Sequence, residues 1–477
     1  MKFHPSGITA RMRPRKRTLA LLAALVLLIW SAVLYRTYRY PFFWDDYHCI
    51  RQYSAQELLS TFHGWDDPDK IETPALRPIV AVLFAFQGFA FGENVILHRI
   101  FLTALMWTFL FVLGLLLAQL QFNTFQIGLV FALFVFSRVF ASVNLWIILS
   151  SLVLCYVLMV LTIILFILWV NQGRFLHFSL MALCALLAVF TREEAYLLPA
   201  ASLLIWALLP DHRRFWRRAL IAALCLLAIT AIHVLFRLIF VPEAPSPRFS
   251  TDALQTLWLC VKSSWLPGGY NTIGFADGLF ANLWIGFLVL LFILFVRMAR
   301  PIKLLQTAGA CCLGFLLCSP AIAVAHPYGL TLPTLAFMTA ISIAVMEVCR
   351  QTQSIVRADK RRQCALVSFL ALGLIIGITG GLRRSMYVAE FLHQNCAPRM
   401  LFDAKFVFDL YERPPTVPER RKAAARSRFA AAGIVTIQDI QSLYRNCVEY
   451  DPEYVQNRQT QTAPFLPKYE YGSYASY

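Results

Sequence analysis

The sequence predicts an all-α polytopic membrane protein with about eleven transmembrane helices. Of its 477 residues, 59% are hydrophobic and only 14% are charged, and the mean hydropathy is +0.62. This composition excludes a soluble globular chain. Apolar runs of about 17 to 25 residues, the length that crosses the hydrocarbon core, recur along the chain. Basic residues gather in short segments between these runs, as they do in cytoplasmic loops.

The first apolar run, residues 18–37, follows a basic N-terminal segment. No small-residue cleavage site follows it, so we expect a retained signal anchor and not a signal peptide. Further spans are predicted at residues 98–119, 125–142, 147–170, 176–191, 195–210, 218–241, 278–297, 302–325, 331–349 and 364–382.

The apolar stretch from Ala75 to Phe91 decides the topology of everything after it. If it spans the membrane, three short basic segments, residues 211–218, 297–303 and 357–362, fall on the outer side. Short basic loops belong in the cytoplasm. We therefore expect an interfacial or re-entrant segment in the first outer loop, with the N-terminus cytoplasmic and the C-terminus extracytoplasmic.

Two regions follow from this topology: a transmembrane domain over residues 1–382 and a small extracytoplasmic region over residues 383–477 with a disordered end. Cys396 and Cys447 both lie in the outer region and could pair. No cysteine and histidine spacing suggests zinc. The net charge of +17 comes mostly from the N-terminus and the inner loops, so we infer no nucleic-acid partner.

Two adjacent carboxylates, Asp45 and Asp46, follow the first span within the run Trp44-Asp45-Asp46-Tyr47-His48. Carboxylates near hydrocarbon are costly to keep. A solvated pair that ends the helix is the simpler interpretation. The alternative is a general base that takes a proton from an acceptor hydroxyl. Adjacent carboxylates also raise one another's proton affinity or share a cation.

Arginines mark two other outer segments. Arg192 and Glu193 lie in a turn between two predicted spans, where they either form a capping ion pair or hold a lipid phosphate, with Glu193 orienting Arg192. Arg77 begins the apolar outer stretch, a position from which arginine commonly reaches lipid headgroups. With Arg99, these arginines would suit a phosphorylated lipid in one outer cavity.

These motifs resemble the integral-membrane glycosyltransferases of the GT-C fold, near the protein O-mannosyltransferase-like family, glycosyltransferase family 39. The Asp45-Asp46 pair looks like the acidic pair in the first outer loop of that family. Arg77-Pro78 is similar to its Arg-Pro signature, and Arg192-Glu193 to its Lys-Glu turn. By motif, the resemblance covers residues 1–210. One departure is the segment of residues 137–146, which lacks the usual acidic residue and puts metal binding in doubt.

The resemblance implies transfer of a sugar from a polyprenyl-phosphate carrier to a glycan, lipid or protein acceptor, at the outer face of a bacterial inner membrane. Asp45 would be the general base, and Asp46 would support it or bind the acceptor or a divalent cation. Arg192, Arg77 and Glu193 would form the donor phosphate site. Residues assigned to acceptor or sugar binding are His48, Trp258, Trp265 and Tyr270.

Two other functions stay open at this point. A transporter or flippase of a lipid-linked saccharide would use the same arginines without catalysis, although no inverted repeat or pair of broken helices is visible in the sequence. A non-catalytic relative that acts as an assembly factor would fit the altered second loop.

Overall fold

A computed structural model describes residues 16–33, 35, 46–68, 75–92, 94–207, 215–242, 264–265, 274–318, 331–355 and 360–394, and every regular element in them is helical. Six helices in this described part are long and apolar enough to cross a membrane by length and composition. They are α5 (Val95–Gln119), α8 (Ser150–Gln172), α11 (Trp216–Phe240), α13 (Gly274–Met298), α16 (Thr331–Ile355) and α17 (Lys360–Gln394). This is the architecture expected of a polytopic membrane protein.

Shorter helices fill the other predicted apolar segments. They are α1 (Lys16–Val33), α4 (Pro78–Phe91), α6 (Thr124–Val135), α9 (Phe175–Val189), α10 (Leu198–Ala207) and α14 (Pro301–Leu317). Each predicted span therefore contains a helix. At 1.5 Å per residue, the 14 residues of α4 cover about 21 Å, less than the ~30 Å of the hydrocarbon core. α6 and α10, which lie in predicted spans, are shorter still, so helix length does not separate an interfacial or re-entrant α4 from a span.

The predicted span over residues 125–142 is wrong as a single helix. α6 ends at Val135, and α7 (Arg138–Leu145) begins after Ser137. The buried Ser137 hydroxyl donates to the Phe134 carbonyl over 2.6 Å and accepts from the Phe140 amide over 3.4 Å. Serine side chains that bond to the local backbone in this way compete with helix continuation and cap a new helix. The interruption therefore has a local chemical cause that hydropathy does not register.

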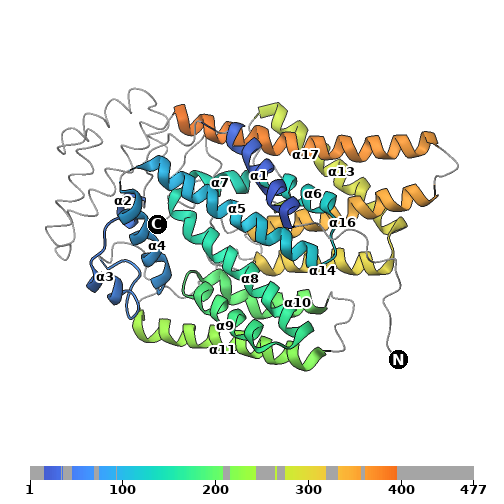
Figure 1. Cartoon of the computed structure of the whole chain (residues 1–477). Helices are drawn as coiled ribbons and strands as arrows, with labels where there is room; N and C mark the ends of the chain where they lie inside the picture. Colours follow the sequence, from blue (N-terminus) through green and yellow to red (C-terminus); the bar gives the residue numbers. More distant parts are fainter. Residues whose placement is uncertain are drawn as a thin grey trace.

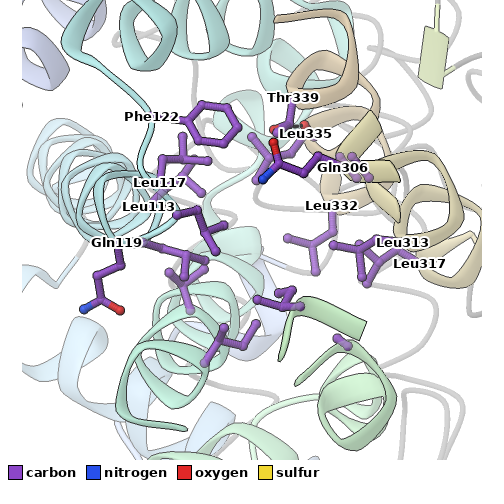
Figure 2. Close-up of a pocket in the computed structure, with 18 of the residues that line it drawn as sticks. Leu113, Leu117, Gln119, Phe122, Gln306, Leu313, Leu317, Leu332, Leu335 and Thr339 are labelled. Atoms are coloured by element: carbon purple, nitrogen blue, oxygen red, sulfur yellow. Dashed lines mark hydrogen bonds between the residues drawn. The ribbon is translucent and has the colours of Figure 1, made fainter. Parts of the chain in front are cut away.

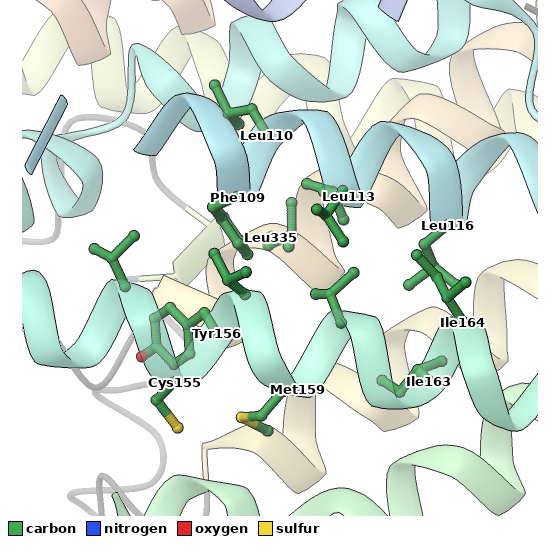
Figure 3. Close-up of a cluster of buried hydrophobic side chains, with 14 of the residues drawn as sticks. Phe109, Leu110, Leu113, Leu116, Cys155, Tyr156, Met159, Ile163, Ile164 and Leu335 are labelled. Atoms are coloured by element: carbon green, nitrogen blue, oxygen red, sulfur yellow. The ribbon is translucent and has the colours of Figure 1, made fainter. Parts of the chain in front are cut away.

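Helix α8 lies at the centre of the larger core, packed against α5 and α9. Figure 3 shows Phe109, Leu113 and Leu116 of α5 directed toward α8, with Leu116 opposite Ile164. This core also draws on α1, α6, α10 and α11, and a second cluster joins α6 to α13, α16 and α17. The short helices α2 (Asp46–Cys49) and α3 (Ala55–Ser60) lie with α4 at one end of the bundle (Figure 1).

Glycine allows close contact between α17 and α13. Gly373 and Gly377 are spaced one helical turn apart, and a Cβ at either would overlap the ring of Phe287 or Trp284 on α13. Small residues at this spacing let membrane helices approach closely, where van der Waals contact is the main attraction between them. The pair fixes α17 against α13.

Candidate functional site

The chain at the start of α4 contacts the turn that precedes α10. Arg77, the residue before α4, donates from Nε to Glu193 Oε2 over 2.9 Å, and its NH2 lies 2.7 Å from the same oxygen. Glu193 begins the short 3-10 helix η3 (Glu193–Leu197). Nearby, the Ile79 amide donates to the Phe190 carbonyl over 3.3 Å. The structure thus joins two of the predicted site residues, Arg77 and Glu193, which are 116 positions apart in the chain.

A third charged residue, Arg237, approaches the same carboxylate. Its Nη1 lies 3.9 Å from Glu193 Oε1. Arg237 is not among the site residues predicted from the sequence, because it lies within the apolar run 218–241 that is predicted as a span. An arginine inside such a run is a signal that could have found it, because ionisable residues are rare there and commonly functional.

Helix α11 is fixed to this site by His233, one turn before Arg237. The ring is buried, and its Nε2 donates to the Leu76 carbonyl over 3.1 Å. Because a carbonyl oxygen only accepts, Nε2 carries the proton and Nδ1 is the acceptor for the Tyr196 hydroxyl, 2.7 Å away. His233 therefore links η3 to the chain just before α4, and its edge packs on Phe190.

The charges at this site are strongly coupled. Burial acts to raise the pKa of Glu193, but the charge and hydrogen bonds of Arg77, with the charge of Arg237, lower it to about 2. Burial acts to lower the pKa of Arg77, and the charges of Glu193 and Asp66 outweigh it and raise that pKa above its ordinary value. Two guanidinium groups therefore share one ionised carboxylate at neutral pH.

Arg192 has a different partner from the one expected. Its Nε lies 3.3 and 3.2 Å from the two carboxylate oxygens of Glu194, whereas Glu193 faces Arg77. The expectation that Glu193 orients Arg192 is therefore wrong. Consecutive residues of a tight helical turn point in different directions, so Glu193 and Glu194 hold separate arginines. The Arg192 and Glu194 side chains are both mostly buried.

Asp46 is fully buried, and its Oδ1 accepts a hydrogen bond from the Ile148 amide over 2.8 Å. Ile148 belongs to the 3-10 turn η2 (Ile147–Leu149), which leads directly into α8. Backbone amides at a helix start have no partner within the helix, and a carboxylate satisfies them well. Asp46 therefore joins the first outer segment to the start of the central helix.

The structure describes only some of the remaining predicted site residues. Asp45, Trp258 and Tyr270 lie outside the described residues, as do Cys396, Cys447 and the side chain of His48. Trp265 stacks on Phe337 of α16, with ring centroids 4.7 Å apart, and its carbonyl accepts from Trp284 of α13 over 3.0 Å. It packs with these two helices.

A cavity in the described part lies elsewhere in the bundle. It has a volume of about 180 Å³, and its walls come from α5, α8, α10, α14 and α16 (Figure 2). None of the predicted site residues lines it. Among the described residues, no three histidine, cysteine or acidic side chains gather in a way that could hold a metal ion.

The chain matches no known protein family, no curated protein and no solved structure. Its function is therefore argued from the residues and their geometry.

Proposed function

We propose that this protein transfers a sugar from a polyprenyl-phosphate carrier to an acceptor hydroxyl on the outer face of a membrane. The observation that supports this most is the meeting of Arg77, Glu193 and Arg237 from three distant segments. Guanidinium groups bind phosphate oxygens in a bidentate fashion, so arginines gathered at one outer turn suit a phosphate. We also propose about eleven spans, a cytoplasmic N-terminus, an extracytoplasmic C-terminus and a location in a bacterial inner membrane.

Asp46 and the arginines contact the same helix, α8, or the turns beside it. Asp46 binds the start of η2, and α8 runs from there past η3. Tyr156, about two turns into α8, lies within the electrostatic reach of Arg192 and Glu194. An acceptor near Asp45 and a carrier phosphate near the arginines would therefore share one end of the bundle.

In the proposed reaction, Asp45 takes the proton from the acceptor hydroxyl as its oxygen attacks the anomeric carbon of the sugar. The bond from that carbon to the phosphate oxygen breaks, and the carrier phosphate leaves as an anion held by Arg77, Arg192 and Arg237. Asp46 positions the loop that carries Asp45, because its own carboxylate is occupied by the Ile148 amide. Glu193 keeps Arg77 in place.

A transporter of a lipid-linked saccharide is the second candidate, and the break between α6 and α7 favours it. Interrupted helices are common at the substrate sites of transporters. A transporter would carry the intact carrier-linked sugar across the membrane, whereas a transferase would cleave it, so the two functions leave different products.

The test uses the full-length protein in proteoliposomes with a panel of radiolabelled polyprenyl-phosphate sugars and membrane extract as the source of acceptor. We expect Asp45→Asn to abolish release of polyprenyl phosphate while leaving the amount of inserted protein unchanged. Glu57→Gln, on the outer helix α3, is the matched control, because glutamine also serves at its capping position.

Full transfer by an Asp45→Asn, Asp46→Asn double variant would overturn the catalytic assignment. Movement of the uncleaved labelled lipid between leaflets by that same variant would establish the transporter instead.

A further inference from the structure

The cavity between α5, α8, α10, α14 and α16 has an apolar lining that suits a hydrocarbon chain. Figure 2 shows Leu113 and Leu117 facing Leu313, Leu317 and Leu332 across it. Protein interiors pack closely and contain few voids larger than a water molecule. An apolar space of about 180 Å³ in a bundle of membrane-length helices therefore matches a flexible hydrocarbon chain better than it matches water.

One end of the cavity is polar. Gln119 and Gln121 at the end of α5, with Gln306 in the first turns of α14, are among the lining residues. Gln306 Oε1 accepts a hydrogen bond from Lys303 Nζ over 2.7 Å. The ammonium group of Lys303 thus lies directly beside the lining of the cavity.

Further positive charge surrounds Lys303. Arg300 and Arg350 are close enough for their charges to act on it, and the single carboxylate among these groups is Glu347. Glu347 is engaged by Arg300, with Nε and NH2 of the arginine 2.8 and 3.1 Å from its two oxygens. Within the described residues, three cations therefore face one carboxylate at this end of the cavity, which favours an anion.

The predicted topology assigns this end to the cytoplasmic side, because α14 begins within the short basic segment of residues 297–303. The cytoplasmic leaflet is rich in anionic phospholipids, and basic residues beside the membrane attract them. We propose that the cavity holds one acyl chain of an anionic phospholipid from this leaflet, with the headgroup phosphate at Lys303. The site is separate from the Arg77 and Glu193 cluster and does not depend on sugar transfer.

The test measures lipid binding to the delipidated, full-length protein in detergent by native mass spectrometry. The probes are phosphatidylglycerol and phosphatidylcholine with identical acyl chains. We expect tighter binding of phosphatidylglycerol, and Lys303→Gln should weaken it about fivefold with no effect on phosphatidylcholine. A fivefold loss corresponds to the ~1 kcal/mol that one basic residue contributes near an anionic membrane surface. Arg217→Gln, an exposed basic position on α11, is the matched control and should change neither affinity.

A second pair of variants tests the cavity itself. Leu335→Trp fills it and should reduce the binding of both lipids, whereas Leu224→Trp on the exposed face of α11 should not. If Leu335→Trp does not fold, Thr339→Leu fills the same space with a smaller change.

Equal affinity for the two phospholipids, or an unchanged affinity in Lys303→Gln, would overturn the proposal. So would equal binding of glycerol phosphate, which lacks acyl chains, because the cavity would then play no part. Preferential binding of polyprenyl phosphate would also overturn it and would make the cavity a carrier site. None of these measurements requires transferase activity, so failure here is distinct from failure of the proposed function.

Discussion

Neutralising Glu193 should destabilise the fold, because this carboxylate holds two arginines from different segments. In Glu193→Gln, the Arg77 guanidinium loses the anion 2.7 Å away, and Arg237 loses the one 3.9 Å away. Lowering the pKa of Glu193 from 4.5 to about 2 corresponds to about 3 kcal/mol in favour of the ionised folded form. The side chain is 21% exposed, so solvent screening reduces this figure, and we expect a loss of about 2 to 3 kcal/mol.

The pH dependence of stability gives a second readout of the same change. Because the pKa of Glu193 is lower in the folded state, its contribution is fully present above about pH 4.5 and is lost as the pH falls toward about 2. The wild-type protein should therefore lose stability over this window relative to Glu193→Gln, in which the residue no longer titrates.

The assay is equilibrium unfolding of the purified protein in mixed micelles, carried out at pH 7 and at several values down to pH 3. Arg77→Gln combined with Glu193→Gln provides a double-mutant cycle, and the combined loss should be smaller than the sum of the two single losses. A loss below about 0.5 kcal/mol for Glu193→Gln at pH 7, the size of an ordinary surface change, would refute the reasoning.

Two further predictions concern packing and capping. Asp46→Asn keeps an oxygen for the Ile148 amide and should cost less than about 1 kcal/mol, whereas Asp46→Leu leaves that amide buried without its acceptor and should cost about 1 to 3 kcal/mol in the same assay. Gly377→Ala places a Cβ against the ring of Trp284 and should lower the melting temperature, whereas Gly286→Ala on α13, where no atom lies within 4 Å of the new Cβ, should leave it unchanged or raise it slightly. Equal melting temperatures for the two glycine variants would contradict the packing argument.

Helix positions could be predicted from the sequence because hydropathy is a local property. Each apolar run contains a helix. The break at Ser137 could not be found in this way, because averaged hydropathy does not register one hydroxyl that bonds to the backbone on both sides. Arg237 was missed for the same reason, since the apolar residues around it dominate the average.

The residues of the site could be predicted from the sequence better than the ion pairs that they form. Arg77 and Glu193 were both expected at the outer end, but adjacency in sequence favoured a pairing of Glu193 with Arg192. The tight turn of η3 directs Glu193 toward α4 and leaves Glu194 to Arg192. Which neighbour a side chain reaches depends on the backbone geometry of a few residues, and that geometry is set by the packing of α9, α10 and α11 around the turn.

Arg77 and Arg237 can have different roles, because one carboxylate does not bind two guanidinium groups equally well. Glu193 holds Arg77 at hydrogen-bonding distance, whereas Arg237 lies 3.9 Å from the other oxygen of the same carboxylate. That oxygen is buried and accepts no hydrogen bond from any described residue. A buried, charged acceptor left in this state is costly, so a rearrangement that brought Arg237 within hydrogen-bonding distance of this oxygen would stabilise the cluster. The pair with Arg77 would maintain the fold, and under the proposed function the remaining N–H donors of Arg237 would bind the carrier phosphate.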